Sequence, residues 1–205
     1  MAIVLKKPSS VSNNKSPRLQ KAALISGANI FLKNVTLEDA EFILSLRLDP
    51  EKNKYLSRTS QSLEDQIAWL KKYEKETDQA YFIICDKSMK KLGCIRMYDP
   101  IDSSYCWGSW LMISGLSPLV SIESVLLIYA YGKNLGFTEA RIDVRKDNIS
   151  VWKFHETIFS ATRIQETDDD YFYIVTQKSI DAALKKFSKL ITLPLLKIKG
   201  DLNGI

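Results

Sequence analysis

The side chains best suited to chemistry lie in residues 140–156, ARIDVRKDNISVWKFHE. His155 is the only histidine in the 205-residue chain, and it follows Asn148 on what the pattern predicts to be a short strand, a turn and a helix. Residues three, four and seven positions apart share a helix face. The imidazole therefore shares its face with the apolar residues Val151, Phe154 and Ile158. We expect it to point towards a core or a cleft.

The position of His155 leaves two interpretations open. An imidazole in a cleft can exchange protons near neutral pH, because its reference pKa is about 6.5. A lone histidine on an apolar helix face is also often a core residue whose ring nitrogen bonds to a backbone carbonyl. Acid–base chemistry and packing are therefore both candidate roles.

Composition bounds the class of protein. A chain of 205 residues with 45% hydrophobic residues is long enough for one packed domain with tails. The net charge of +5 suits an anionic small ligand such as a nucleotide. The basic excess lies largely in the terminal segments 6–21 and 178–199. Nucleic-acid binding usually needs a clustered basic patch, so no nucleic-acid partner is predicted.

The cysteines and apolar segments indicate a cytoplasmic protein. Cys85, Cys94 and Cys106 are odd in number and form no CxxC pair, so neither a disulfide framework nor a zinc site is predicted. All three fall in predicted strands, where we expect them to be buried like small apolar residues. Free cysteines are typical of a reducing compartment such as the cytoplasm. No apolar run reaches the roughly 18 residues of a membrane span. The N-terminal apolar stretch is too short for a secretory signal.

Three segments divide the chain. Residues 1–28 are rich in Ser, Asn, Lys and Pro and are predicted to form an extended or disordered leader. The folded domain is expected at residues 29–177. Residues 178–205 should contain a helix at Ser179–Leu190, followed by the apolar and basic segment LITLPLLKIKG. That segment could dock on the domain or on a second subunit in a homodimer, or contact a membrane surface.

The order of elements within the domain indicates the fold class. Thr36 and Ser62 are each followed by acidic residues, a signal for a helix start. Two further helices are predicted at Ile122–Leu135 and Ile149–Phe159. Strands are predicted at Ile30–Asn34, Ala80–Asp86, Leu92–Tyr98, Tyr105–Ile113, Ala140–Lys146, Thr162–Glu166 and Tyr171–Gln177. The order predicts an α/β (α+β) fold with a mixed, mostly antiparallel sheet of about 6–7 strands and about 4 helices.

This order of elements resembles the GNAT superfamily of acetyl-CoA-dependent acetyltransferases over residues 30–177. Two segments carry the resemblance. FILSLRLDPEKNKYLS, at residues 42–57, is similar to the first-helix segment of one branch of the family. That branch includes ribosomal-protein N-terminal and nucleotide-amino-sugar N-acetyltransferases. GFTEARIDVRKDNISVWKFHE, at residues 136–156, is similar to the family's closing strand, asparagine and helix.

The resemblance implies roles for the second segment. Asn148 matches the asparagine that caps the helix beside the pantetheine arm of coenzyme A. His155 matches the tyrosine with which family members protonate the departing thiolate, which makes His155 the implied catalytic residue. A neutral imidazole can donate a hydrogen bond. A protonated one is an acid whose pKa, about 6.5, approaches the thiol's, about 8.5.

The phosphate-binding loop departs from the family pattern. Relatives usually read Q/R-x-x-G-x-G/A, which brings backbone N–H groups and a helix N-terminus to the pyrophosphate. Residues 114–121, SGLSPLVS, contain one glycine, no basic residue and Pro118, which has no N–H. Ser117 and Ser121 add hydroxyl donors. Glu123 is expected in the first helical turn, where it would repel a pyrophosphate, so the loop leaves the mode of acetyl-CoA binding open.

The resemblance implies direct transfer from acetyl-CoA without a metal. Main-chain N–H groups at the end of the strand that closes at residue 113 would polarise the thioester carbonyl. The residues assigned to cofactor binding are Leu111, Met112, Ile113, Ser117, Ser121 and Asn148. A general base would take the proton of the amine. Asp99 and Asp102 are candidates for that base, although turn formation explains both.

Three residues are predicted to contact the acceptor. Arg47 could bind a phosphate, and Tyr55 and Trp107 could stack on a nucleotide or sugar. The structural alternatives are an ion pair of the arginine with a neighbouring carboxylate and core packing of the aromatic rings.

The residues and the resemblance together predict a cytoplasmic N-acetyltransferase. The acceptor is a primary amine on a small molecule, with an amino-sugar nucleotide favoured. One alternative is a protein N-terminal acetyltransferase. The other is a GNAT-fold binding or assembly module that has lost catalysis.

Overall fold

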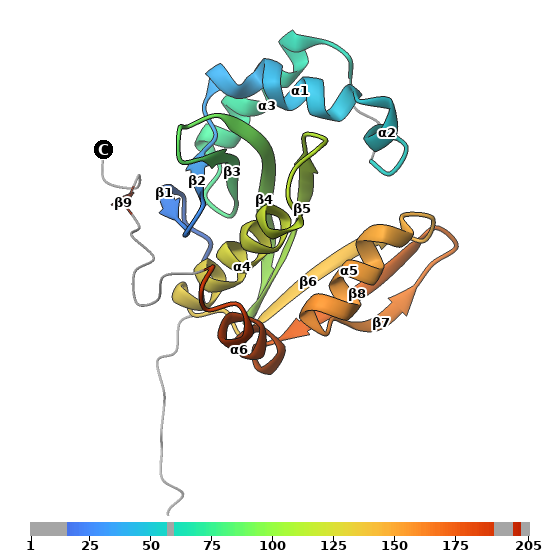
Figure 1. Ribbon diagram of the computed structural model, residues 1–205. Helices are drawn as coiled ribbons and strands as arrows, with labels where there is room; N and C mark the ends of the chain where they lie inside the picture. The colour runs from blue at the N-terminus through green and yellow to red at the C-terminus, as the bar shows by residue number, and fades with distance from the viewer. Residues whose placement is uncertain (1–15, 57–59, 191–198, 202–205) are drawn as a thin grey trace, which may run out of the picture.

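The structure, a computed structural model, describes residues 16–56, 60–190 and 199–201. Figure 1 shows the arrangement of its elements. The strands are β1 (Ala22–Ser26), β2 (Ile30–Asn34), β3 (Ala80–Asp86), β4 (Lys91–Ile101), β5 (Ser104–Met112), β6 (Glu139–Arg145), β7 (Thr162–Glu166), β8 (Asp170–Thr176) and β9 (Lys199–Asp201). The helices are η1 (Leu37–Asp39), α1 (Ala40–Leu48), α2 (Pro50–Asn53), α3 (Leu63–Lys75), α4 (Pro118–Asn134), α5 (Ile149–Phe159) and α6 (Gln177–Lys186).

One sheet contains all of these strands, in the order β7-β8-β6-β5-β4-β3-β2-β1-β9. Neighbouring strands are antiparallel except for β5 and β6, which run parallel. This arrangement confirms the predicted mixed, mostly antiparallel class. The sheet has more strands than predicted, because β1 and β9 were not expected.

Helices cover both faces of the sheet. Alternate residues of a strand point to opposite faces, and the alternation along β3 separates two apolar clusters. Phe82 and Ile84 pack in the cluster that includes α4 and the last turn of α5. Tyr81 and Ile83 pack in the cluster that includes α1 and α3. The sheet therefore has an α4/α5 face and an α1/α3 face.

β5 and β6 separate soon after they pair. Their register joins only residues 104–106 to residues 139–141, and beyond Cys106 the strands diverge (Figure 1). A bulge bends β5 where they part, because Gly108 pairs with Arg96 whereas Leu111 pairs with Cys94. Ser109 in the bulge has a φ of 48°. The bulge shifts the in–out alternation of side chains along β5 by one residue, so that Trp107 and Trp110 both lie on the α4/α5 face.

The N-terminal segment differs from the prediction. Residues 1–28 were expected to be an extended or disordered leader, but β1 lies within them and pairs with β2. Leu19, Ala22 and Ile25 are buried in the core. Apolar burial therefore holds residues 19–26 against the domain, while residues 1–15 lie outside the described part of the chain.

Helix boundaries also shift. α4 begins at Pro118, four residues before the predicted start, because Ser117 caps it and proline fits the first turn. α2 was not predicted. α6 ends at Lys186, before the predicted Leu190. The segment LITLPLLKIKG lies mostly outside the described residues, so its docking and the homodimer stay predictions.

Two further predictions concern the cysteines and membrane-spanning helices. Cys85, Cys94 and Cys106 are free and buried, as predicted. Within the described residues, no helix is both long enough and apolar enough to cross a membrane.

Candidate functional site

A cleft of about 530 Å³ opens where β5 and β6 separate. One side is formed by the end of α1 and by α2, and the other by β6 and the start of α5. The bulged part of β5 lines it between them. Because β6 leaves β5 here, the edge of β5 beyond Cys106 has no neighbouring strand. Every second backbone N–H and C=O on that edge therefore faces the cleft.

Eight of the ten predicted site residues line this cleft. They are Arg47, Tyr55, Trp107, Leu111, Met112, Ser121, Asn148 and His155. They come from four separate elements and two connecting segments, so the fold brings together residues that are up to 108 positions apart in the sequence. Their individual roles stay predictions.

Ile113 and Ser117 do not line the cleft. The N–H of Ile113 donates to the carbonyl oxygen of Leu92 at 2.8 Å, because the ladder between β4 and β5 continues to this point. That N–H is therefore not available to polarise a thioester. The backbone donors with access to the cleft lie earlier on β5.

The N-terminus of α4 begins one turn earlier than the sequence suggested. Ser117 is its N-cap, and Pro118 occupies the first turn. The N–H groups of Leu119 and Val120 donate to the hydroxyl and the carbonyl of Ser117 at 3.3 and 3.0 Å. In the described part of the chain, no backbone carbonyl accepts the N–H of residues 115, 116 or 117. The donors left for an anion are therefore those of the loop itself.

Gly115 gives the loop its shape. Its φ is +79°, a conformation that favours glycine, and a Cβ at this position would meet no atom within 4 Å. The loop is thus open to solvent in front of a 17-residue helix whose dipole favours an anion.

Glu123 does not face this loop in the way the sequence suggested. It lies in the second turn of α4, and its side chain is fully buried against the β1–β2 turn. Its carboxylate accepts hydrogen bonds from the N–H and side-chain amide of Asn29 at 2.8 and 2.9 Å and from the N–H of Ile30 at 3.3 Å. The carboxylate is turned towards the β1–β2 turn, so it does not face an anion at the loop as the sequence suggested.

His155 is almost completely enclosed at the base of the cleft. Its side chain is 2% exposed, and its ring lies 5.3 Å from that of Trp107 and 5.2 Å from that of Phe154. This apolar burial lowers the pKa of the imidazole from 6.5 to about 3. The ring is therefore neutral at physiological pH, which removes the protonated form of the predicted acid.

His155 also has an unsatisfied ring nitrogen. Nδ1 is buried and has no hydrogen-bond partner among the described residues. The core interpretation required a bond to a backbone carbonyl, and no such bond is made. An unpaired polar atom costs free energy when it is buried. The core interpretation therefore lacks the hydrogen bond on which it depended, while His155 still lines the cleft.

Trp107 and Tyr129 also carry buried polar atoms without a hydrogen bond of good geometry. These atoms are the Nε1 of Trp107 and the hydroxyl of Tyr129, and the centres of the two rings are 5.9 Å apart. Trp107 is only 2% exposed. It packs in the core as well as lining the cleft, so its ring has little free surface on which an acceptor could stack.

The lining of the cleft includes three cations and three carboxylates. Arg47, Lys52 and Arg145 are the cations, and Glu51, Asp143 and Asp170 are the carboxylates. Lys52 also pairs with Asp49. The lining can therefore contact both anionic and cationic groups of a ligand.

Sequence reasoning missed Asp143, Arg145 and Asp170, all of which line the cleft. The signal was the alternation of β6, in which Ile142 and Val144 are buried and the odd-numbered residues face the other way. Nothing in that pattern distinguishes a cleft from open solvent.

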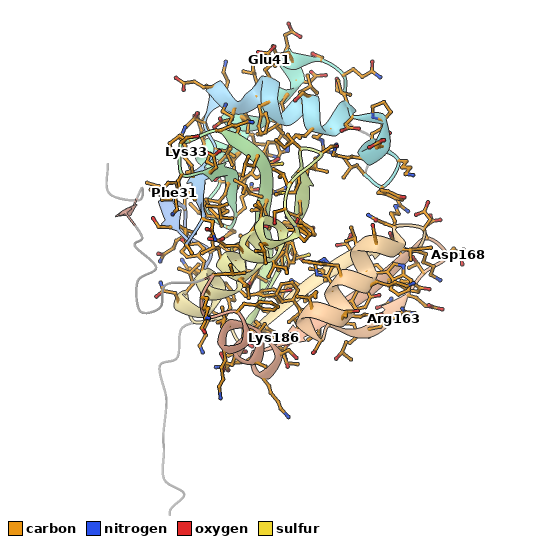
Figure 2. The ribbon with its side chains drawn as sticks, in the orientation of Figure 1. Phe31, Lys33, Glu41, Arg163, Asp168 and Lys186 are labelled. Carbon is orange, nitrogen blue, oxygen red and sulfur yellow. The ribbon has the colours of Figure 1, made fainter. Side chains whose placement is uncertain are left out.

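Neither carboxylate that the sequence offered as the general base lines the cleft. Asp99 pairs with Arg141 at 3.2 Å, and Asp102 lies in the β4–β5 turn with a φ of 51°. Asp169 and Asp170 pair with Arg145 at 3.3 and 3.5 Å. Asp168 lies at the tip of the β7–β8 hairpin (Figure 2). No cluster of potential metal ligands occurs within the described residues.

Comparison with known proteins identifies the class to which this fold and cleft belong. Residues 29–158 match the family described as Acetyltransferase (GNAT) domain. The chain therefore belongs to the GNAT acetyltransferase family. No curated protein matches the chain significantly.

Solved structures share the fold. A structure described as apo FdhC, a nucleotide-linked sugar GNAT, is 27% identical with a TM-score of 0.72, over 85% of this chain and 99% of that one. A GCN5-related N-acetyltransferase from Brucella melitensis is 16% identical with a TM-score of 0.70, over 87% and 90% of the two chains. Spermidine N-acetyltransferase from Vibrio cholerae, solved with CoA and spermine, is 13% identical with a TM-score of 0.65, over 74% and 97%.

Proposed function

We propose that the protein transfers an acetyl group from acetyl-CoA to a primary amine carried by a nucleotide-linked sugar. The observation that carries this proposal is the cleft between β5 and β6, which is lined by Ser121 in the first turn of α4, by His155, and by the cations Arg47, Lys52 and Arg145. Such a cleft lets an acyl donor and an acceptor reach each other from opposite faces.

The loop before α4 fits the pyrophosphate of acetyl-CoA despite its single glycine. The N–H groups of residues 115–117 are not used by backbone carbonyls of the described chain, and Gly115 leaves space for an approaching ligand. Glu123 is turned into the core. Acetyl-CoA would supply the activated acyl group, and this loop would hold its phosphates through backbone N–H groups and the helix dipole.

His155 fits the thioester end of the same ligand. It is neutral, so it would act by donating a hydrogen bond to the leaving sulfur rather than as an imidazolium. A donor at the place where negative charge develops stabilises the transition state. Asn148 lies two turns earlier on the same helix face and would contact the pantetheine arm.

The acceptor class rests on charge and on the comparison at 27% identity. Arg47, Lys52 and Arg145 would contact a diphosphate, and Tyr55 offers an aromatic ring beside them. The cleft also has three carboxylates, Glu51, Asp143 and Asp170. An acceptor that carries both phosphates and an amine, such as a nucleoside-diphosphate-linked amino sugar, therefore fits this mixed lining.

Two measurements test the proposal. Calorimetric titration should detect acetyl-CoA binding, and lack of binding at millimolar ligand would overturn the enzymatic interpretation in favour of a binding module. Mass spectrometry should detect acetylation of members of a panel of UDP- and dTDP-linked amino sugars, but not of spermidine or of peptides with a free N-terminus. Acetylation confined to the peptides would instead establish an N-terminal acetyltransferase.

Inhibition supplies a matched control for the acceptor. UDP or dTDP should compete with the sugar nucleotide, whereas uridine or thymidine, which lack the phosphates, should not. Equal inhibition by nucleotide and nucleoside would contradict a role for the cleft cations in phosphate binding.

A further inference from the structure

Asp143 is a cleft carboxylate for which the proposed function has no role. It lies on β6 two residues after Arg141, the last residue of β6 that pairs with β5. Its neighbours Ile142 and Val144 are buried on the α4/α5 face. Asp143 therefore projects on the α1/α3 face, where the acceptor would enter, at the point where the two strands begin to part.

Two polar side chains approach Asp143 from the neighbouring strands. The thiol of Cys106 on β5 donates to its Oδ1 with a sulfur–oxygen distance of 3.9 Å. Burial raises the pKa of this thiol to about 11, so it remains an S–H donor at neutral pH. The phenol of Tyr98 on β4 adjoins the same thiol, and burial raises its pKa as well. Neither group brings a charge to the site.

No cation forms an ion pair with Asp143 in the described part of the chain. Arg145, the nearest arginine along the exposed side of β6, pairs with Asp169 and Asp170 instead. Arg141 pairs with Asp99. The carboxylate is thus free to accept a cation from a ligand, and it is open to solvent along the cleft wall.

The surroundings make Asp143 a stronger base than an ordinary aspartate. Although the carboxylate is reachable by solvent, the protein atoms around it raise its pKa by burial, and the charge of Asp170 on β8 adds to this effect. The thiol of Cys106 and the charge of Arg145 act in the opposite direction without cancelling it. A carboxylate of raised pKa takes a proton from an ammonium group more readily.

We propose that Asp143 binds the ammonium form of the acceptor and takes its first proton. The inference rests on the proposed function, because it needs an acetyl donor in the same cleft. The step converts R–NH₃⁺ and a carboxylate into R–NH₂ and a carboxylic acid. The amine nitrogen then forms a bond to the acetyl carbon, and the carbon–sulfur bond breaks. A second proton of the nitrogen goes to the thiolate of coenzyme A, and Asp143 releases the first proton to solvent.

The test compares Asp143→Asn with Asp102→Asn in the full-length protein. Asp102 lies in the β4–β5 turn and does not line the cleft, so the control makes the same chemical change outside the site. The acceptor is the member of the UDP- and dTDP-linked amino-sugar panel that the wild type acetylates fastest. We expect D143N to lower kcat/KM by about 10²–10⁴-fold. D102N should match the wild type, and acetyl-CoA affinity should be unchanged in both variants.

The pH profile separates a base from a merely structural residue. The wild-type kcat/KM should be level between the pKa of Asp143 and that of the acceptor amine. In D143N only the free amine reacts, so kcat/KM should rise about tenfold per pH unit up to the amine's pKa. A deficit that is the same at every pH would overturn the assignment, as would an unchanged kcat/KM.

Other outcomes distinguish this inference from the proposed function. If the wild type binds no acetyl-CoA, the proposed function fails. If the wild type transfers normally and D143N loses acetyl-CoA binding, only the role of Asp143 is overturned. If no panel member is acetylated, the rate of acetyl-CoA hydrolysis is measured instead. Water then takes the place of the amine as the nucleophile, and the same base would deprotonate it. An unchanged hydrolysis rate in D143N overturns the assignment in that case.

Discussion

At the scale of single residues, burial decides how His155 can act. The sequence predicted that the imidazole points inward, and the structure places it in the cleft wall. It could not predict the extent of desolvation, because that depends on Trp107 and Trp110, which a bulge 45 or more residues earlier turns towards the ring. The result is a neutral histidine with an unpaired nitrogen instead of a titrating acid.

This burial makes a prediction for stability. The pKa of His155 is about 3 in the folded protein and about 6.5 in the unfolded chain. The unfolded chain therefore binds more protons between these values, and stability should fall as pH drops below 6.5, by up to about 1.4 kcal/mol per pH unit. His155→Phe removes this contribution. Urea unfolding between pH 7 and pH 4.5 should show the wild type losing stability faster than H155F, and parallel curves would contradict the burial.

Asp143 shows a second limit at the residue scale. Alternation along residues 139–145 predicts the strand and its two faces, and it assigns Asp143 to the polar face. A polar position on a strand usually faces bulk solvent. Only the separation of β5 from β6 makes this one part of a cleft, and that separation is a property of two strands whose paired residues are 35 positions apart.

At the scale of elements, several boundaries could be predicted and one important boundary was not. β3, α5 and β7 have the predicted limits: apolar residues mark the first two, and the polar turn at residues 167–169 marks the end of β7. The start of α4 was placed too late, since residues 114–121 carry little apolar periodicity. Ser117 followed by Pro118 was a usable signal, because serine favours the N-cap and proline the first helical position.

A substitution at the N-cap of α4 tests acetyl-CoA binding separately from the stability of the fold. Ser117→Asp keeps a good N-cap and adds a negative charge to the positive end of the helix, so the thermal midpoint should be unchanged or higher. The same charge would repel a pyrophosphate, and the Kd for acetyl-CoA should rise roughly tenfold, or about 1.4 kcal/mol.

Thr176→Asp provides the matched control for this change. Thr176 is the N-cap of α6, and its hydroxyl accepts from the N–H of Ser179 as that of Ser117 accepts from Leu119. It belongs to a different helix and, like Ser117, does not line the cleft. Calorimetry and thermal unfolding should show a similar effect of the two substitutions on stability and an effect of Ser117→Asp alone on binding. Equal acetyl-CoA affinity in both variants would contradict phosphate binding at the α4 N-terminus.

At the scale of the whole molecule, the fold class followed from the order of elements, whereas the extent of the sheet did not. The sequence AALIS of β1 is short and lies in a segment rich in polar and basic residues. Its composition therefore resembled that of a leader. The burial of Ala22 and Ile25 comes from packing in the cluster that includes α4, and Leu24 lies opposite Lys199 of β9, 175 positions away. Local pattern carries no information about partners at such distances.

The integration of β1 into the core leads to a prediction for Ile25. Its side chain has no exposed surface and packs in the cluster that includes α4, so Ile25→Ala should lower the free energy of unfolding by about 2–5 kcal/mol. Ile164→Ala is the control, because Ile164 lies on the edge strand β7 and is 56% exposed. Its cost should stay within about 0.5 kcal/mol. Urea unfolding monitored by tryptophan fluorescence measures both, and equal small effects would mean that β1 does not belong to the folded domain.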